Sequence, residues 1–180
     1  MTRLSDPDLE AAQPILDQML RDPSGASPAI YLGMAHNPGF LDIFRFMSAE
    51  TRARTSLDPT DRELIIHRVA ALCGTPYEWG IHATLVAGPL GLGDEWLEAT
   101  WSGSGDDFDR AEHRALVVAC DELHTSSRLS DAAWQGLREV FTEAQIVEIL
   151  FLVGYYHLVC FTENALELPV EPWSRPAPTP

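Results

Sequence analysis

The stretch DRELIIHRVAALCGTPYEWGIH, residues 61–82, decides the fold of this chain. Its first half is apolar on nearly all sides when it is wound as a helix, and a Gly-Thr-Pro turn separates it from a second helix. Glu63 and His67 are four residues apart, and so are Glu78 and His82. Because this spacing places each pair on one helical face, we expect two Glu/His pairs inside an apolar core.

The rest of the sequence is also helical in pattern. Asn37-Pro38 and Asp58-Pro59 each combine an N-cap residue with proline at the first helical position. Thr75 with Glu78, and Thr142 with Gln145, have the spacing of capping boxes. Ser130 is a further N-cap candidate. Helices are therefore expected over about residues 6–20, after 38, over 59–73, 76–87, around 96, over 108–124, after 130 and over 143–166.

No segment alternates β-branched residues, so we predict an all-α fold, a single-domain helical bundle. The domain should span residues 1–167. Residues 168–180 contain five prolines and are expected to form an extended tail, which we expect to be free to wrap a neighbouring subunit. A chain of 180 residues can bury a core without disulfides or metals.

Composition excludes several classes of protein. The net charge is −15, so nucleic acid and anionic membrane surfaces are not expected partners. Residues 1–6 lack a secretory signal, and the apolar segment 149–161 is too short to cross a bilayer and is interpreted as a buried helix. Three cysteines without a CxxC pair indicate buried thiols in the cytoplasm.

Each polar residue of the deciding stretch has a structural and a functional interpretation. Glu78 completes a capping box with Thr75, and it also stands one turn before His82. His82 fits a hydrogen-bonded core histidine, or a proton carrier whose basicity is set by a carboxylate. Glu63 fits a buried ion pair with a nearby arginine, or a group that orients His82.

A metal site is not expected. Two Glu/His pairs on neighbouring helices suggest a di-metal centre, but such bundle sites use Glu and His three residues apart together with further carboxylates. His157 and Asn164 are polar positions in the apolar last helix, and they fit a pocket, solvation or a subunit contact equally well. No phosphate-binding loop, nucleophile elbow or HExxH motif occurs, so no cofactor is expected.

The segment from Arg62 to His82, with its Arg-Glu-Leu start and its Tyr-Glu-Trp-x-x-His end, resembles the carboxymuconolactone decarboxylase family, which is related to alkyl hydroperoxidase D. The resemblance implies an all-helical fold of the alkyl hydroperoxidase D-like type and a homo-oligomer, whether dimer, trimer or hexamer. In the peroxidase branch a Glu precedes a CxxC pair and a His. Thr75 and Glu78 stand where these cysteines would be, so thiol peroxidase chemistry is disfavoured.

The resemblance therefore implies a cofactor-free carboxy-lyase that acts on a small carboxylated or lactone substrate by proton transfer. Its catalytic residues would be His82, Glu63 and Glu78. The substrate would be held by two arginines, two further histidines and two aromatic residues. These are Arg62, Arg68, His67, His157, Tyr77 and Trp79. Peroxidase activity through lone cysteines, which requires an exposed reactive thiol, and a non-catalytic small-molecule-binding oligomer remain alternatives.

Overall fold

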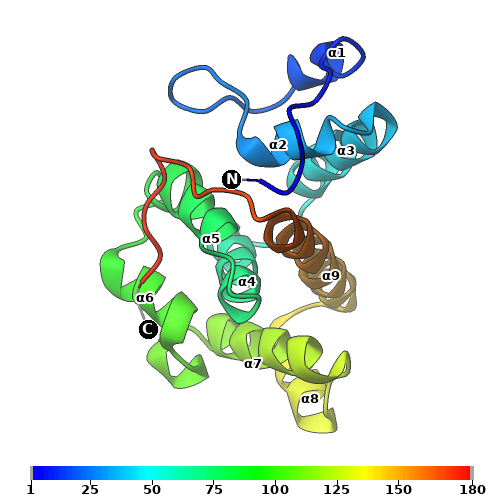
Figure 1. Ribbon diagram of the computed structural model, residues 1–180. Helices are drawn as coiled ribbons and strands as arrows, with labels where there is room; N and C mark the ends of the chain where they lie inside the picture. Colours follow the sequence, from blue (N-terminus) through cyan, green and yellow to red (C-terminus); the bar gives the residue numbers. More distant parts are fainter. Residues whose placement is uncertain (1, 179–180) are drawn as a thin grey trace.

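A computed structural model describes residues 2–178, and this part of the chain is helical with no β-strand (Figure 1). The all-α prediction is confirmed. The elements are α1 (Gln13–Leu16), α2 (Ala29–Met34), α3 (Pro38–Ala53), α4 (Pro59–Leu72), α5 (Pro76–His82), a π-helical turn η1 (Ala83–Ala87), α6 (Asp94–Ser102), a 3-10 turn η2 (Gly105–Asp107), α7 (Ala111–Ser126), α8 (Asp131–Val140) and α9 (Glu143–Leu166).

Helix α4 is the centre of the bundle. It packs against α5, α6, α7 and α9, and Leu64, Ile65, Ile66 and Val69 are completely buried. A helix that is apolar all round can be stable only if neighbours cover every side, so the α4 sequence fixes the arrangement around it. The polar residues Glu63 and His67 are carried into the same interior.

The capping signals place most helices correctly. Asn37 and Asp58 cap α3 and α4, and Ser130 caps α8. Thr142 and Gln145 form the predicted capping box of α9.

One helix prediction is wrong, and a second is confirmed in extent but not in helix type throughout. Before α2, only residues 13–16 form an α-helix, because Pro14 occupies the start of that helix and limits what precedes it. The predicted helix over 76–87 is α-helical only to His82 and continues as a π-turn.

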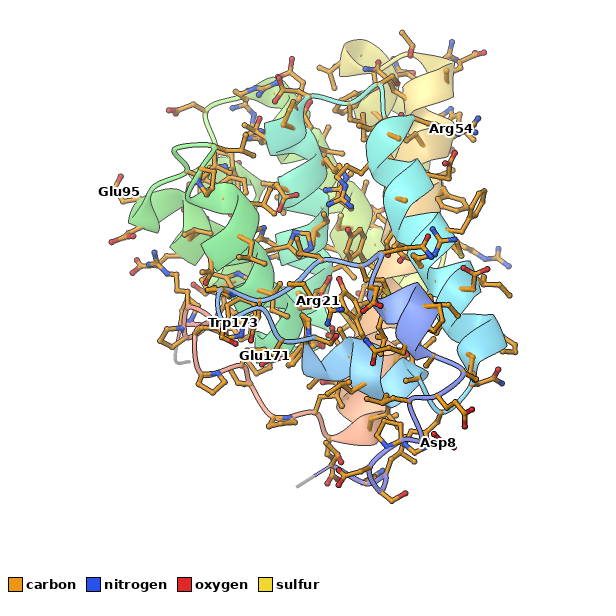
Figure 2. All side chains as sticks on the ribbon, turned by 90° about the horizontal axis from the view of Figure 1, so that it is seen from above. Asp8, Arg21, Arg54, Glu95, Glu171 and Trp173 are labelled. Carbon is orange, nitrogen blue, oxygen red and sulfur yellow. The ribbon has the colours of Figure 1, made fainter. Side chains whose placement is uncertain are left out.

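The described part of the tail packs on its own chain, and its contact with a neighbouring subunit stays a prediction. Glu171 accepts hydrogen bonds from the backbone of Ala29 and the hydroxyl of Tyr77, at 2.7 and 2.8 Å. Figure 2 shows Glu171 and Trp173 on this segment. A Cβ at position 80 would stand 2.5 Å from the carbonyl oxygen of Arg175, so glycine is required there for the tail to approach α5.

Helix α9 is half covered, which corrects the prediction of a buried helix. Among the described residues it is long and apolar enough to cross a membrane, by length and composition alone, and 44% of that window is buried inside the protein. One side packs on α4, whereas Val147, Phe151 and Phe161 are exposed. A core helix of a globular protein with one uncovered apolar face has the same composition as a membrane-spanning helix. The predicted homo-oligomer stays a prediction.

Candidate active site

A hydrogen-bonded chain of four side chains joins α4, α5 and α9. The carboxylate of Glu63 lies 2.7 Å from Nδ1 of His82 through one oxygen, and it accepts a hydrogen bond from Arg62 at 2.9 Å through the other. Arg62 also donates to the hydroxyl of Tyr156 at 3.0 Å. Glu63 is 1% exposed, so this buried carboxylate is held by partners on both sides.

Glu78 completes the surroundings of His82. Its carboxylate lies 3.4 Å from Nε2 of His82, one helical turn away, so a carboxylate faces each nitrogen of the ring. The predicted capping box at this helix is wrong, because Thr75 makes no side-chain cap. The hydroxyl of Thr75 instead accepts a hydrogen bond from Asn164 of α9, and the Glu78 side chain turns inward.

These neighbours set the charges of the site. Burial alone would lower the pKa of His82, but the carboxylates of Glu63 and Glu78 raise it to about 9. Burial likewise opposes ionisation of Glu63 and Glu78, yet the His82 imidazolium brings the pKa of each below its ordinary value. At neutral pH His82 is therefore a cation between two carboxylates.

Glu163 is a site residue that the sequence reasoning missed. It is 2% exposed on α9, and no hydrogen-bond donor reaches either carboxyl oxygen among the described residues. Burial, together with the adjacent charge of Glu78, raises the pKa of Glu163 well above its ordinary value. Glu163 thus adjoins Glu78, and its surroundings favour the protonated form of its carboxyl group. A glutamate inside an otherwise apolar helix was the available signal.

A cavity of about 200 Å³ opens beside His82. Arg62, Glu78 and His82 lie in its wall, and Glu63 supports His82 from behind. Helices α2, α3 and α9 supply much of the remaining surface, which is largely apolar and aromatic, from Ile30, Tyr31, Phe44, Tyr155 and Tyr156. Residues 18–20, α5 and η1 complete it. Polar groups at the far wall include Ser48, whose hydroxyl is 2.6 Å from that of Tyr155. Exposed Arg52 lies at the margin.

Five of the sequence-predicted residues stand apart from this cavity for identifiable reasons. Arg68 pairs with Asp121 at 2.7 Å and turns to the backbone of Gly103. Trp79 donates to Thr100 in the core, and Tyr77 holds the tail.

His67 is fully buried, and its Nδ1 lies 2.8 Å from the backbone carbonyl of Glu63. Its ring stands edge-on to Trp79. Burial lowers the pKa of His67 to about 4, so it is neutral where His82 is charged.

His157, the remaining predicted residue, lies in a second polar cluster with Cys73 and His124. The neighbouring Cys160 thiol and His157 lower the pKa of Cys73 to about 5. Cys73 is half-buried, whereas Cys120 and Cys160 are fully buried. This cluster shares no residue with the wall of the 200 Å³ cavity.

No family model matches the chain. It is 28% identical over 133 residues to the uncharacterized protein YnjA of Escherichia coli K12. The matched region covers 73% of this chain and 72% of that protein. The structure is similar to that of an uncharacterized peroxidase-related protein with an alkylhydroperoxidase AhpD core from Ralstonia eutropha JMP134 (TM-score 0.78, 19% identity, 95% of this chain and 93% of that one). An uncharacterized peroxidase-related protein from Silicibacter sp. TM1040 matches with TM-score 0.73 and 18% identity over 94% of this chain and 96% of that one. The chain therefore has the AhpD-like fold.

Proposed function

We propose that the protein is a cofactor-free acid–base enzyme that transfers a proton to a small carboxylated or lactone substrate, as a carboxy-lyase does. The observation that carries the proposal is the pairing of both ring nitrogens of His82 with carboxylates at the wall of a small cavity. A histidine held in one orientation with a raised pKa is equipped to donate a proton.

The cavity favours a small anionic substrate. Its volume of about 200 Å³ is below the range usual for drug-sized ligands, and its surface is mostly apolar. Arg62 and Arg52 supply positive charge, Arg62 in the wall and Arg52 at the margin. An arginine can hold a carboxylate or an oxyanion that forms during the reaction.

The residues suggest a sequence of steps. The bond to the carboxylate carbon breaks, carbon dioxide leaves, and the electron pair spreads into a conjugated carbonyl whose oxygen Arg62 stabilises. His82 then gives its proton to the carbon, which forms the new C–H bond. Because Nδ1 is held by Glu63, Nε2 is the nitrogen that exchanges the proton. Water restores the proton through Glu78, whose neighbour Glu163 has a raised pKa.

A substrate screen with His82 variants tests this proposal. Small unsaturated lactone acids and aromatic-pathway carboxylates would be incubated with the protein, and carbon dioxide release would be followed. On a confirmed substrate, His82→Ala should lower kcat about 10²–10⁴-fold. His36→Ala, which removes an exposed histidine outside the cavity wall, should retain the rate. A folded His82→Ala protein with an undiminished rate would contradict the proposal.

Thiol peroxidase activity is the second candidate, because both fold neighbours are described as peroxidase-related. Cys73 is the thiol that it would use, as the least buried of the three. The candidate predicts hydroperoxide-dependent oxidation of the native protein that Cys73→Ser abolishes and His82→Ala leaves intact. Carbon dioxide release has the opposite dependence on these variants, so the two activities are distinguishable.

A further inference from the structure

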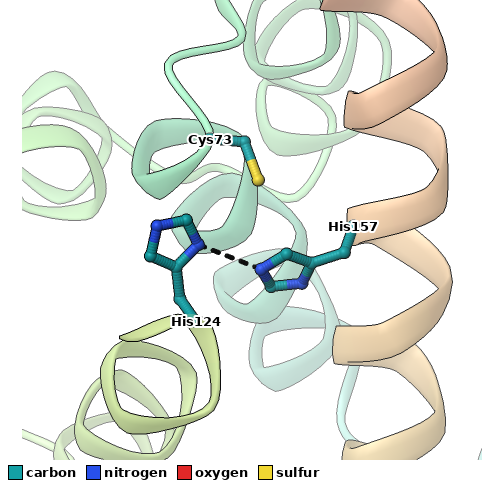
Figure 3. A group of neighbouring side chains, drawn as sticks. All are labelled: Cys73, His124 and His157. Atoms are coloured by element: carbon teal, nitrogen blue, oxygen red, sulfur yellow. Dashed lines mark hydrogen bonds between the residues drawn. The ribbon is translucent and has the colours of Figure 1, made fainter. Parts of the chain in front are cut away.

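Cys73, His124 and His157 bring three metal-ligating atoms together from three helices. Cys73 follows the last turn of α4, His124 lies near the end of α7, and His157 lies on α9. Their ligand atoms all lie within 4.8 Å of one another. Figure 3 shows the thiol and both imidazoles pointing toward a common point. The sequence did not predict this cluster, since its members are 51 and 33 residues apart.

Without a metal, His124 and His157 are hydrogen-bonded to each other through the nitrogens that face the cluster, and a metal ion would replace the proton that they share. Nδ1 of His157 lies 2.7 Å from the carbonyl oxygen of Val153 and donates its proton there. That bond fixes the tautomer, so Nε2 presents its lone pair to the cluster, as metal-binding histidines commonly do. Nδ1 of His124 is 3.0 Å from this Nε2. Two nitrogens on one tetrahedral zinc ion stand about 3.3 Å apart, so little movement is needed.

The donor set selects the class of metal. One thiolate and two imidazoles suit borderline transition metals such as Zn²⁺, and they do not suit Mg²⁺ or Ca²⁺, which prefer oxygen ligands. The net charge of −15 favours cations in general. His124 is exposed and the other two ligands are half-buried, so the cluster is open to solvent.

We propose that Cys73, His124 and His157 bind a divalent transition metal ion of the Zn²⁺ class, with a fourth coordination position open to water or a small ligand. This site is separate from the His82 cavity. The two are about 15 Å apart along α4, from Glu63 to Cys73. Three protein ligands and an accessible fourth position are the arrangement of reactive rather than purely structural zinc sites.

Metal titration of the tag-free, reduced, full-length protein tests the proposal. One equivalent of Zn²⁺ should bind in calorimetry with a dissociation constant of about 1 µM or lower. Co²⁺ should give a sulfur-to-cobalt charge-transfer band and the intense visible absorption of a tetrahedral ion. Zn²⁺ should also protect Cys73 from alkylation by iodoacetamide, measured by mass spectrometry of the labelled peptide.

Matched variants identify the ligands. Cys73→Ser should abolish the charge-transfer band, and His124→Ala or His157→Ala should each weaken Zn²⁺ binding at least about 10-fold. The controls are Cys120→Ala, which removes a buried thiol outside the cluster, and His36→Ala, and both should bind as the parent does. Circular dichroism of each variant establishes that it is folded.

Three results would overturn the proposal. The first is that the folded, reduced protein shows no saturable binding of Zn²⁺ or Co²⁺ at 100 µM metal. This concentration is about 100 times the expected dissociation constant. The second is a cobalt spectrum that Cys73→Ser leaves unchanged. The third is equal alkylation of Cys73 with and without Zn²⁺, as expected of a free thiol next to Cys160.

Discussion

The two ends of α4 carry polar clusters of opposite character. Near its start, Glu63 and Glu78 are buried, and these carboxylates hold the partly exposed His82 as a cation. After its last turn, Cys73 stands with two histidines, no carboxylate is among the three ligands, and solvent reaches them. The neighbours of each histidine therefore differ, because two carboxylates hold His82 as a cation, whereas a thiol and a second imidazole face His157.

His67 sharpens this comparison within a single helix. His67 lies one turn after Glu63. Its Nδ1 is 2.8 Å from the backbone carbonyl oxygen of Glu63 and 3.9 Å from the Glu63 carboxylate. Aromatic rings from Trp79 and Trp96 cover it. Its pKa is about 4, whereas that of His82 is about 9. Direct contact with carboxylates, more than depth of burial, separates the two histidines.

The largest effect is expected from removing the carboxylate that the first cluster shares. Glu63→Gln leaves the His82 and Arg62 charges without their common partner in the interior, so the free energy of unfolding should fall by about 3 kcal/mol. Urea unfolding at pH 7 measures this. Glu167→Gln, which breaks a surface pair with Arg3, is the control and should cost less than about 1 kcal/mol. Equal losses in the two variants would show that the cluster is not held by Glu63.

His67 should make the protein acid-sensitive. Its folded pKa of about 4 lies below the ordinary value of 6.5, so protonation favours the unfolded chain. Stability from this group is complete above pH 6.5 and is lost as the pH falls toward 4, by about 3 kcal/mol in all. His67→Phe should reduce the difference between the urea unfolding midpoints measured at pH 6.5 and at pH 5. If this difference is the same in the variant as in the parent protein, other groups cause the acid sensitivity.

Glu163 should act in the opposite direction. Its folded pKa is raised, so the native state holds a proton that the unfolded chain releases above about pH 4.5. Stability from this group is complete below that pH and declines as the pH rises toward the folded pKa. Glu163→Gln imitates the neutral acid and should remove the decline, with a change of less than about 1 kcal/mol at pH 5. A variant that loses stability equally at pH 5 and pH 8 would contradict a neutral Glu163.

The smallest effect on the fold is expected at the exposed face of α9. If this face is the subunit contact, Phe161→Glu should lower the mass measured by light scattering while the helical circular dichroism stays unchanged. Phe40→Glu, which alters an exposed apolar residue of α3, is the control. A parent protein that is already monomeric would remove the basis for an oligomer.

The sequence predicted the helices better than the contacts between them. Caps at Asn37, Asp58, Ser130 and Thr142 are local signals, and each was confirmed. The same local reasoning failed at Thr75, because Asn164 of a distant helix bonds its hydroxyl.

The candidate site was predictable to a similar degree. The spacing of Glu78 and His82 and the family resemblance placed Glu63, Glu78 and His82 in one set. Neither could show that Arg68 would pair with Asp121, or that Glu163 would adjoin Glu78, since those partners depend on tertiary packing.

The central claim is that Glu63 and Glu78 hold His82 as a cation for proton transfer, and NMR titration of the histidine side-chain nitrogens tests it most directly. The His82 signals, assigned through His82→Gln, should titrate near pH 9, and Glu63→Gln should lower that midpoint. A His82 midpoint at or below 6.5, or one that Glu63→Gln leaves unchanged, would contradict the account.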